Sequence, residues 1–162
     1  MNAYTEKWME RNAIKHYGKT AQEDKCIEEM AELTQAIIKY RLDPDSTEKK
    51  LNLVEEMEDV RIMLEQMVLM HGPIPEVSVK FEGSDRLRMD TCIRFLAELQ
   101  NAIARDRLGL TNCMTVAITN ACLGLELITK IFGRELLIRE EKLNRLTSRI
   151  LKDQIREETQ DE

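Results

Sequence analysis

The chain has 162 residues, of which 33% are charged, 43% are hydrophobic and only 4% are aromatic. A chain of this length can bury a core without disulfide bonds, and a composition rich in Leu, Glu, Met, Ala, Lys and Arg favours helices. The formal net charge of -6 and the lack of a basic segment lead us to expect no nucleic-acid partner.

Four cysteines, Cys26, Cys92, Cys113 and Cys122, contain no CxxC pair and lie among apolar residues of predicted helices. This pattern predicts reduced core cysteines, which suits the cytoplasm. The N-terminus lacks the apolar run of a signal peptide. We expect no membrane partner, because we expect no segment to meet the length and hydrophobicity of a membrane span.

The spacing of apolar residues predicts one all-α domain over residues 1–162. The predicted helices cover about 1–17, 20–42, 47–70, 84–107, 112–132 and 134–158, and they are separated by Gly18, Asp43-Pro44 and Gly72. Residues 73–83 contain two prolines and are expected to be a linker between a unit at 1–72 and a unit at 84–158.

The chain aligns with itself when Asp24–Leu42 is placed on Asp90–Leu108, where about half of the residues are identical. An internal duplication explains this match. The alternative is a chance similarity between helices rich in Ala, Leu and Glu. We therefore predict a helical bundle built from two tandem repeats.

Two acidic pairs, Glu29 with Glu32 and Glu56 with Asp59, are each three residues apart, so each pair shares one helix face. Two antiparallel helices could bring all four carboxylates together. Carboxylate oxygens without histidine suit Mg²⁺, with Mn²⁺ as the alternative ion.

Acids on a helix usually face solvent, which is the alternative interpretation. At about 100° per residue, however, Glu56 falls inside the apolar arc of its helix, and Glu29 and Glu32 flank an apolar stripe. Acids against a core repel one another and need a cation or a proton. Glu55 and Glu58 fall further round the helix, and we expect them to meet solvent.

The second repeat has lost this chemistry. The alignment places Phe95 on Glu29, and a less similar alignment of the next helices places Ala117 on Glu56 and Asn120 on Asp59. Only Glu32 keeps an acidic counterpart, Glu98. The second repeat is therefore predicted to be degenerate.

At these acids the chain resembles the MazG-like, all-α nucleoside triphosphate pyrophosphohydrolases, a superfamily that also contains the dimeric dUTPases. Their signature is an EExxE helix followed by an ExxD helix, which match Glu28–Glu32 and Glu56–Asp59. The match covers residues 20–72, and Glu141–Leu146 resembles the helix with Lys and Arg that closes many members.

The resemblance implies hydrolysis of a nucleoside triphosphate between its α- and β-phosphates, which yields the monophosphate and pyrophosphate. It implies that Mg²⁺ is held by Glu29, Glu32, Glu56 and Asp59, and that Glu28 takes a proton as the catalytic base.

Lys142 and Arg145 are implied contacts to the substrate phosphates, and their alternative role is as exposed helix charges. Family members usually pair two subunits, so we expect an internal pseudo-dimer here, and further homo-oligomers stay open. Trp8, His16 and Tyr17 precede the first motif, and they either stack on a base or belong to the core.

The alternative function is a non-catalytic helical module that binds nucleotide or metal for regulation or assembly. The residues do not select a base, so dUTP, dCTP, a modified nucleotide and a broad range all stay compatible.

Overall fold

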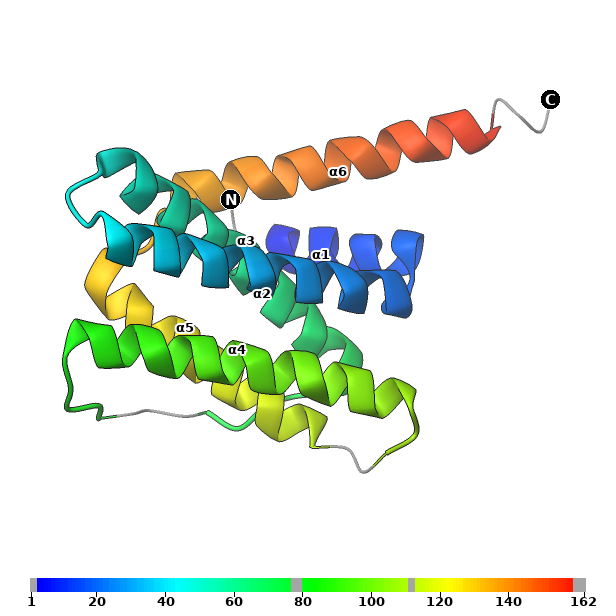
Figure 1. Cartoon of the computed structure of the whole chain (residues 1–162). Helices are drawn as coiled ribbons and strands as arrows, with labels where there is room; N and C mark the ends of the chain where they lie inside the picture. The colour runs from blue at the N-terminus through cyan, green and yellow to red at the C-terminus, as the bar shows by residue number, and fades with distance from the viewer. Residues whose placement is uncertain (1–2, 77–79, 111–112, 159–162) are drawn as a thin grey trace.

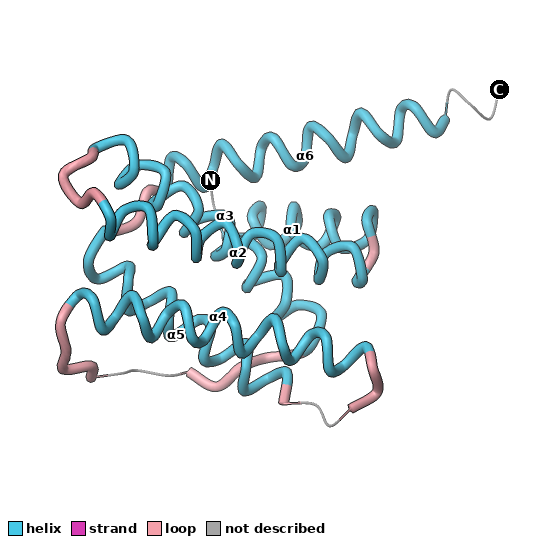
Figure 2. Tube along the Cα trace, viewed as in Figure 1, coloured by secondary structure: helices cyan, strands magenta, loops and turns pink. Residues whose placement is uncertain are grey.

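A computed structural model of the chain describes residues 3–76, 80–110 and 113–158, and all regular structure in these ranges is helical (Figures 1 and 2). The all-α prediction is confirmed. In chain order the helices are α1 (Ala3–Tyr17), α2 (Lys19–Leu42), α3 (Thr47–His71), α4 (Asp85–Arg107), α5 (Met114–Phe132) and α6 (Leu136–Glu158). The expected linker joins α3 to α4, and its residues 77–79 lie outside the described residues.

Capping residues set the ends of the longest helices. Ser46 Oγ accepts a hydrogen bond from the backbone N–H of Lys49 at 3.3 Å at the start of α3, which satisfies a donor that has no partner within the helix. Gly72 ends α3 with φ at 101°, a conformation that residues with a side chain rarely adopt. These caps define the helix that carries Glu56 and Asp59.

The helices form three layers (Figure 1). The α2–α3 hairpin lies in the middle, the α4–α5 hairpin packs on one side of it, and α1 and α6 pack on the other side. Helix α3 contacts α1, α2, α5 and α6, so most of its circumference is covered. The largest fully buried side chains come from α2 to α5 and are Met30, Leu33, Ile37, Leu53, Met57, Met67, Leu96, Leu99, Ile103, Ile118, Leu125 and Ile128.

Two reciprocal ion pairs join α2 to α4. Arg41 of α2 contacts Asp90 of α4 at 2.7 Å, and Arg107 of α4 contacts Asp24 of α2 at 2.6 Å. The predicted alignment pairs Arg41 with Arg107 and Asp24 with Asp90, so each contact is the copy of the other, as at a twofold interface. Exposed ion pairs contribute at most about 1 kcal/mol, so these pairs report the arrangement of the helices more than their stability. The duplication and the division into two units stay predictions.

Several expectations about exposure are wrong. Cys113 is exposed because it precedes α5 as its N-cap residue, whereas a core position was expected. Trp8 and Tyr17 are 50% and 36% exposed, so neither belongs to the core. Cys26 and Cys92 are fully buried as expected, and burial raises the pKa of each thiol to about 12.

Helix α5 is long and apolar enough to cross a membrane by length and composition, although no such segment was expected. In the bundle it packs against α3 and α4 and buries apolar residues such as Ile118, Leu125 and Ile128. This helix lies in an outer layer of the bundle, and 39% of its apolar segment is buried.

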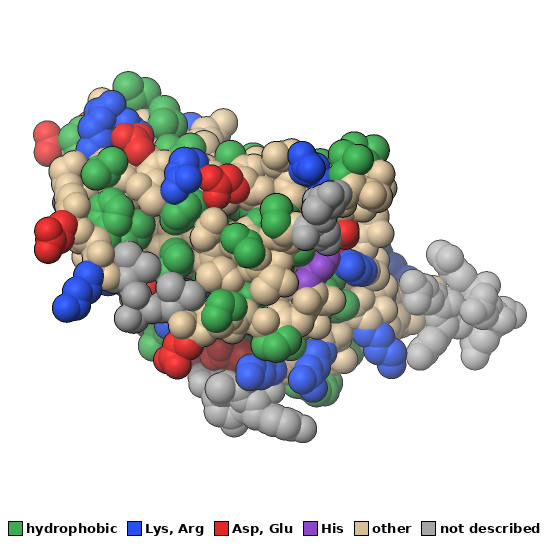
Figure 3. Space-filling view, turned by 90° about the horizontal axis from the view of Figure 1, so that it is seen from below, with side chains coloured by type: hydrophobic (Ala, Val, Ile, Leu, Met, Phe, Trp, Pro, Cys, Tyr) green, Lys and Arg blue, Asp and Glu red, His purple; other side chains and the backbone are tan. Residues whose placement is uncertain are grey.

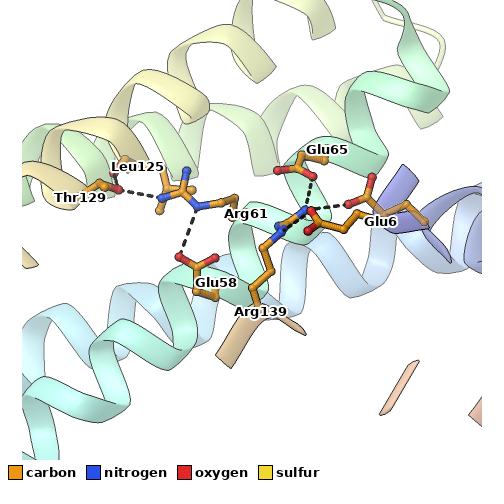
Figure 4. A network of polar contacts seen from close by, with 8 residues as sticks. Glu6, Glu58, Arg61, Glu65, Leu125, Thr129 and Arg139 are labelled. Atoms are coloured by element: carbon orange, nitrogen blue, oxygen red, sulfur yellow. Dashed lines mark hydrogen bonds and ion pairs between the residues drawn. The ribbon is translucent and has the colours of Figure 1, made fainter. Parts of the chain in front are cut away.

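Glu58 is completely buried, which corrects the expectation that it meets solvent. One of its oxygens lies 3.5 Å from Arg61 Nε, and Arg61 in turn donates a hydrogen bond to Thr129 Oγ1 of α5 at 2.8 Å (Figure 4). Helix α5 packs against α3 here, and a helical wheel of α3 alone cannot reveal this neighbour.

A second buried network fastens α6 to the rest of the bundle. Arg139 Nε donates to Glu6 at 3.0 Å, and its Nη2 contacts Glu10 at 3.1 Å and also Glu65 (Figure 4). Burial, together with a hydrogen bond to Glu65, raises the pKa of Glu10 to about 9. Because Arg139 precedes Lys142 by one helical turn, the network holds the part of α6 that faces the acids.

Charges are mixed on the face that is seen from below (Figure 3). Basic side chains there stand among apolar and acidic ones, and the described residues of this face form no continuous basic surface. This one face therefore lacks the charge pattern typical of nucleic-acid binding, and the expectation of no nucleic-acid partner stays a prediction.

The close approach of α4 and α5 gives a first prediction, at Gly124. A methyl group there would lie 3.0 Å from Cα of Cys92 and 3.3 Å from Cδ2 of Phe95. A change from Gly to Ala inside a helix normally stabilises by about 0.5–1 kcal/mol, but overpacking should make Gly124→Ala less stable by about 1–3 kcal/mol. Urea unfolding measures this difference.

Asn101→Ala, at an exposed position of α4, is the control and should be neutral or stabilising. A Gly124→Ala protein more stable than the wild type would contradict the tight packing.

Candidate functional site

Four carboxylates meet in one cavity between α2 and α3. Glu29 and Glu32 come from α2, Glu56 and Asp59 come from α3, and all four line a cavity of about 530 Å³. Carboxylate oxygens of Glu29, Glu32 and Glu56 lie within 4.8 Å of one another. The structure therefore brings together the four residues that were predicted to hold a metal.

Burial and mutual repulsion disfavour the charged forms of these acids. Burial, followed by the nearby charges of Asp59 and Glu32, raises the pKa of Glu56 to about 7. Burial also raises the pKa of Glu29, although a hydrogen bond from Lys25 opposes this shift. Without a bound cation, Glu56 therefore exchanges its proton near neutral pH.

Two lysines offset part of the negative charge. Lys25 Nζ lies 2.8 Å from Glu29 and 2.9 Å from Glu28, and Lys142 Nζ of α6 donates to Asp59 Oδ2. Burial alone would lower the pKa of Lys25, but its hydrogen bonds to Glu29 and Glu28 outweigh burial and raise it. A metal ion could take the place of either lysine beside its acid, and a ligand could become the new partner of the lysine.

Helix α6 places further cations at the cavity. Arg145 and Arg149 line it together with Lys142. Arg145 is exposed and pairs with Glu141 at 2.8 Å one turn away on the same helix. The two predicted phosphate contacts therefore both lie beside the acids, on a helix that Arg139 fastens to the bundle.

Glu28 is placed differently from the other predicted residues. Its side chain is 56% exposed, it is hydrogen-bonded to Lys25, and it does not line the cavity. To reach a water molecule beside the other acids, Glu28 would have to leave Lys25. Its role as a base stays a prediction.

Sequence reasoning missed several residues of the cavity. Lys25 could have been found, since it precedes Glu29 by one helical turn and such pairs contact each other. Arg149 follows Arg145 at the same spacing. Gln22 and Gln66 are polar but almost fully buried at the cavity wall, and no spacing rule marks such residues.

Among the described residues, the corresponding part of the second hairpin has no acidic cluster. Glu98 accepts a hydrogen bond from Asn120 Nδ2 at 3.3 Å and pairs with Arg94 at 2.9 Å. Glu98, Ala117 and Asn120 line a smaller cavity of about 240 Å³. The residues that the alignment matches to Glu32, Glu56 and Asp59 thus lie together, but an amide and a methyl group replace two of the acids.

A second group of potential ligand atoms comprises Glu23, His71 and Asp106. Glu23 Oε1 lies 3.0 Å from His71 Nε2, and Glu23 Oε2 accepts hydrogen bonds from Arg107 at 3.4 Å. Because protein groups already compensate Glu23, we interpret this cluster as a junction between α2 and the C-terminal ends of α3 and α4.

The donor set at the main cavity fits a hard divalent cation. Its acidic ligands are carboxylates, and neither histidine nor cysteine is among the described residues that line it. Mg²⁺ and Mn²⁺ prefer such oxygen ligands, whereas zinc and copper sites usually contain nitrogen or sulfur. A divalent ion would also offset the repulsion from Asp59 and Glu32, which together with burial, the larger cause, raises the pKa of Glu56.

No family model matches this chain, and the searches of curated proteins and of solved structures also return no match. The geometry of the cavity and the residues of the two acidic helices therefore carry the functional argument.

The raised pKa of Glu56 gives a prediction about stability. The pKa is about 7 in the folded protein and 4.5 as its reference value, so between these values the folded state holds a proton that the unfolded state has released. The folded wild type therefore becomes less stable relative to the unfolded state as the pH rises from 4.5 to about 7. Glu56→Gln does not titrate, and its stability relative to the wild type should increase by about 1–2 kcal/mol between about pH 5 and about pH 8, with solvent screening allowed for.

Chemical unfolding in the presence of EDTA measures this difference at both pH values. Glu126→Gln, which removes an exposed acid of α5, is the control, and its effect should change little with pH. A difference between Glu56→Gln and the wild type that stays constant with pH would contradict the burial and repulsion of Glu56.

Proposed function

We propose that this protein is an Mg²⁺-dependent nucleoside triphosphate pyrophosphohydrolase, which converts a (d)NTP into the (d)NMP and pyrophosphate. The observation that carries the proposal is the meeting of Glu29, Glu32, Glu56 and Asp59 in one cavity with a row of cations on α6. These acids belong to the EExxE and ExxD motifs on which the chain resembles the MazG-like superfamily.

The charges in the cavity complement a metal–triphosphate complex. The acids would hold the metal, and Lys25, Lys142, Arg145 and Arg149 line the same cavity as candidate partners for phosphate oxygens. An ion-bound triphosphate would free Lys25 and Lys142 from their contacts with Glu29 and Asp59. The metal ion would then be the partner of the acids, and the phosphates would be the partners of the lysines.

Hydrolysis requires a water molecule to form a bond to a phosphorus atom beside the α,β-bridging oxygen while the bond to that oxygen breaks. A bound Mg²⁺ supplies charge neutralisation and lowers the pKa of a coordinated water. The cations of α6 would orient the phosphates and stabilise the charge that develops on the leaving pyrophosphate. The proton of the attacking water would pass to Glu28.

The second hairpin would act as an inactive partner for the first one. It supports α3 through the hydrogen bond from Arg61 to Thr129, and it supports α2 through Gln100, whose Nε2 donates to the backbone oxygen of Ile27 at 3.3 Å. We therefore propose an internal pseudo-dimer that keeps one active cavity.

Turnover tests the function directly. With Mg²⁺, the purified protein should release pyrophosphate from at least one member of a panel of dNTPs, and EDTA should abolish the release. Glu56→Gln and Glu32→Gln should each lower kcat/KM by about 100-fold or more, because each removes a metal ligand. Glu98→Gln, the counterpart of Glu32 in the second hairpin, is the matched control and should keep full activity.

A panel without turnover above the Glu56→Gln level would reject the hydrolase. In that case, an increase in melting temperature with Mg²⁺ and nucleotide would support the non-catalytic binding module, since a ligand that binds only the folded state stabilises it.

The role of Glu28 has a separate test. Glu28→Gln should lower kcat by about 100-fold, the usual contribution of a general base. It should leave the stabilisation by Mg²⁺ unchanged, because Glu28 is outside the group of acids that approach one another. If Glu28→Gln retains wild-type kcat, Glu28 is not the base.

A further inference from the structure

Gln66 is a buried polar residue that the proposed chemistry does not use. It belongs to α3, it is only 1% exposed, and it lines the same cavity as the four acids. Among the described residues, its buried Oε1 atom has no hydrogen-bond partner. Buried carbonyl oxygens nearly always have a partner, because leaving one without a donor costs its lost hydration.

The second hairpin indicates that folding does not require a polar residue at this position. The alignment that pairs Asp59 with Asn120 pairs Gln66 with Leu127, which is buried to a similar extent at 4% exposure. Leucine is close to glutamine in size and satisfies the same packing without an unpaired oxygen. The amide of Gln66 therefore has a purpose other than filling the core.

The place of Gln66 in the cavity indicates which part of a nucleotide it would meet. It follows Asp59 by two turns on the same face of α3, about 10 Å further along the helix axis. Ile62 and Met63 line the cavity on α3 between these two residues, and Leu146 of α6 lines it as well. Acids and cations suit the phosphates, whereas an apolar wall that ends at a buried amide suits the ring of a base.

We propose that Gln66 is a specificity-determining residue: a rotation of its side chain would turn the buried Oε1 into the cavity, where it accepts a hydrogen bond from an N–H group on the edge of the nucleobase. The inference rests on the proposed function, in that it takes the phosphates of a nucleotide to lie at the acids. Gln22 of α2, which is 5% exposed, is another buried amide that lines the same cavity. The ligand class is a nucleotide with an intact hydrogen-bonding base, as opposed to inorganic triphosphate.

Binding can test this role independently of turnover. The probes are the non-hydrolysable α,β-imido analogues of dUTP, dTTP, dCTP, dATP and dGTP, and tripolyphosphate is the probe without a base. Each is titrated with Mg²⁺ into the full chain by calorimetry. Gln66→Leu should weaken the tightest-bound nucleotide by about tenfold or more and reduce the differences among the five, because it removes the acceptor for the base. The affinity of Gln66→Leu for tripolyphosphate should change by less than about twofold, because this probe has no base to donate a hydrogen bond.

Two further measurements keep the test decisive. Gln66→Met is a second apolar variant of similar volume, in case Gln66→Leu does not fold. With the wild-type protein, methylation of the edge N–H of the preferred nucleotide should weaken binding to a similar degree, because the methyl group removes the donor.

The failures of the two proposals differ. Base preference that depends on Gln66, without pyrophosphate release, would reject the hydrolase and support the recognition by Gln66. Turnover with unchanged base preference in a folded Gln66→Leu protein would overturn the role of Gln66 and leave the hydrolase standing. A protein that binds none of the nucleotides would overturn the role of Gln66 as well.

Discussion

The repulsion among Glu29, Glu32, Glu56 and Asp59 is the constraint on which the rest of the structure depends. Two helices of one hairpin hold these acids in a partly buried cavity, where burial and neighbouring charges raise the pKa of Glu56 to about 7. Such an arrangement destabilises a folded protein unless cations compensate it. Lys142 of α6 provides part of the compensation, so the position of α6 and the chemistry of the cavity depend on each other.

Helix α6 is held by contacts that lie outside the cavity. Arg139 joins it to Glu6, Glu10 and Glu65, which belong to α1 and α3. A buried ion network of this kind contributes little net stability, because desolvation offsets the attraction between its charges. It does favour one position of α6 over others, since any other position would leave the buried carboxylate of Glu10 without its partner. The cations at the cavity are thereby positioned against α3.

Periodicity could predict the six helices and the pairing of the four acids, because both follow from contacts within one helix or between neighbours in sequence. The environment of Glu58 could not be predicted, since it depends on α5, which lies far from α3 in sequence. Gln66 was missed for a related reason. An isolated glutamine on an apolar face carries no spacing signal, and its unpaired oxygen becomes visible only when its surroundings are known.

The second hairpin separates what the fold needs from what the cavity needs. Where the first hairpin has Glu29, Asp59 and Gln66, the alignment gives Phe95, Asn120 and Leu127, while the apolar stripe persists. Repelling acids and an unpaired amide oxygen lower stability, and the second hairpin packs without them. If the two hairpins share an origin, the first one has kept these polar residues although they lower the stability of the fold. Stability does not account for them, and this supports the proposed binding of a ligand in the cavity.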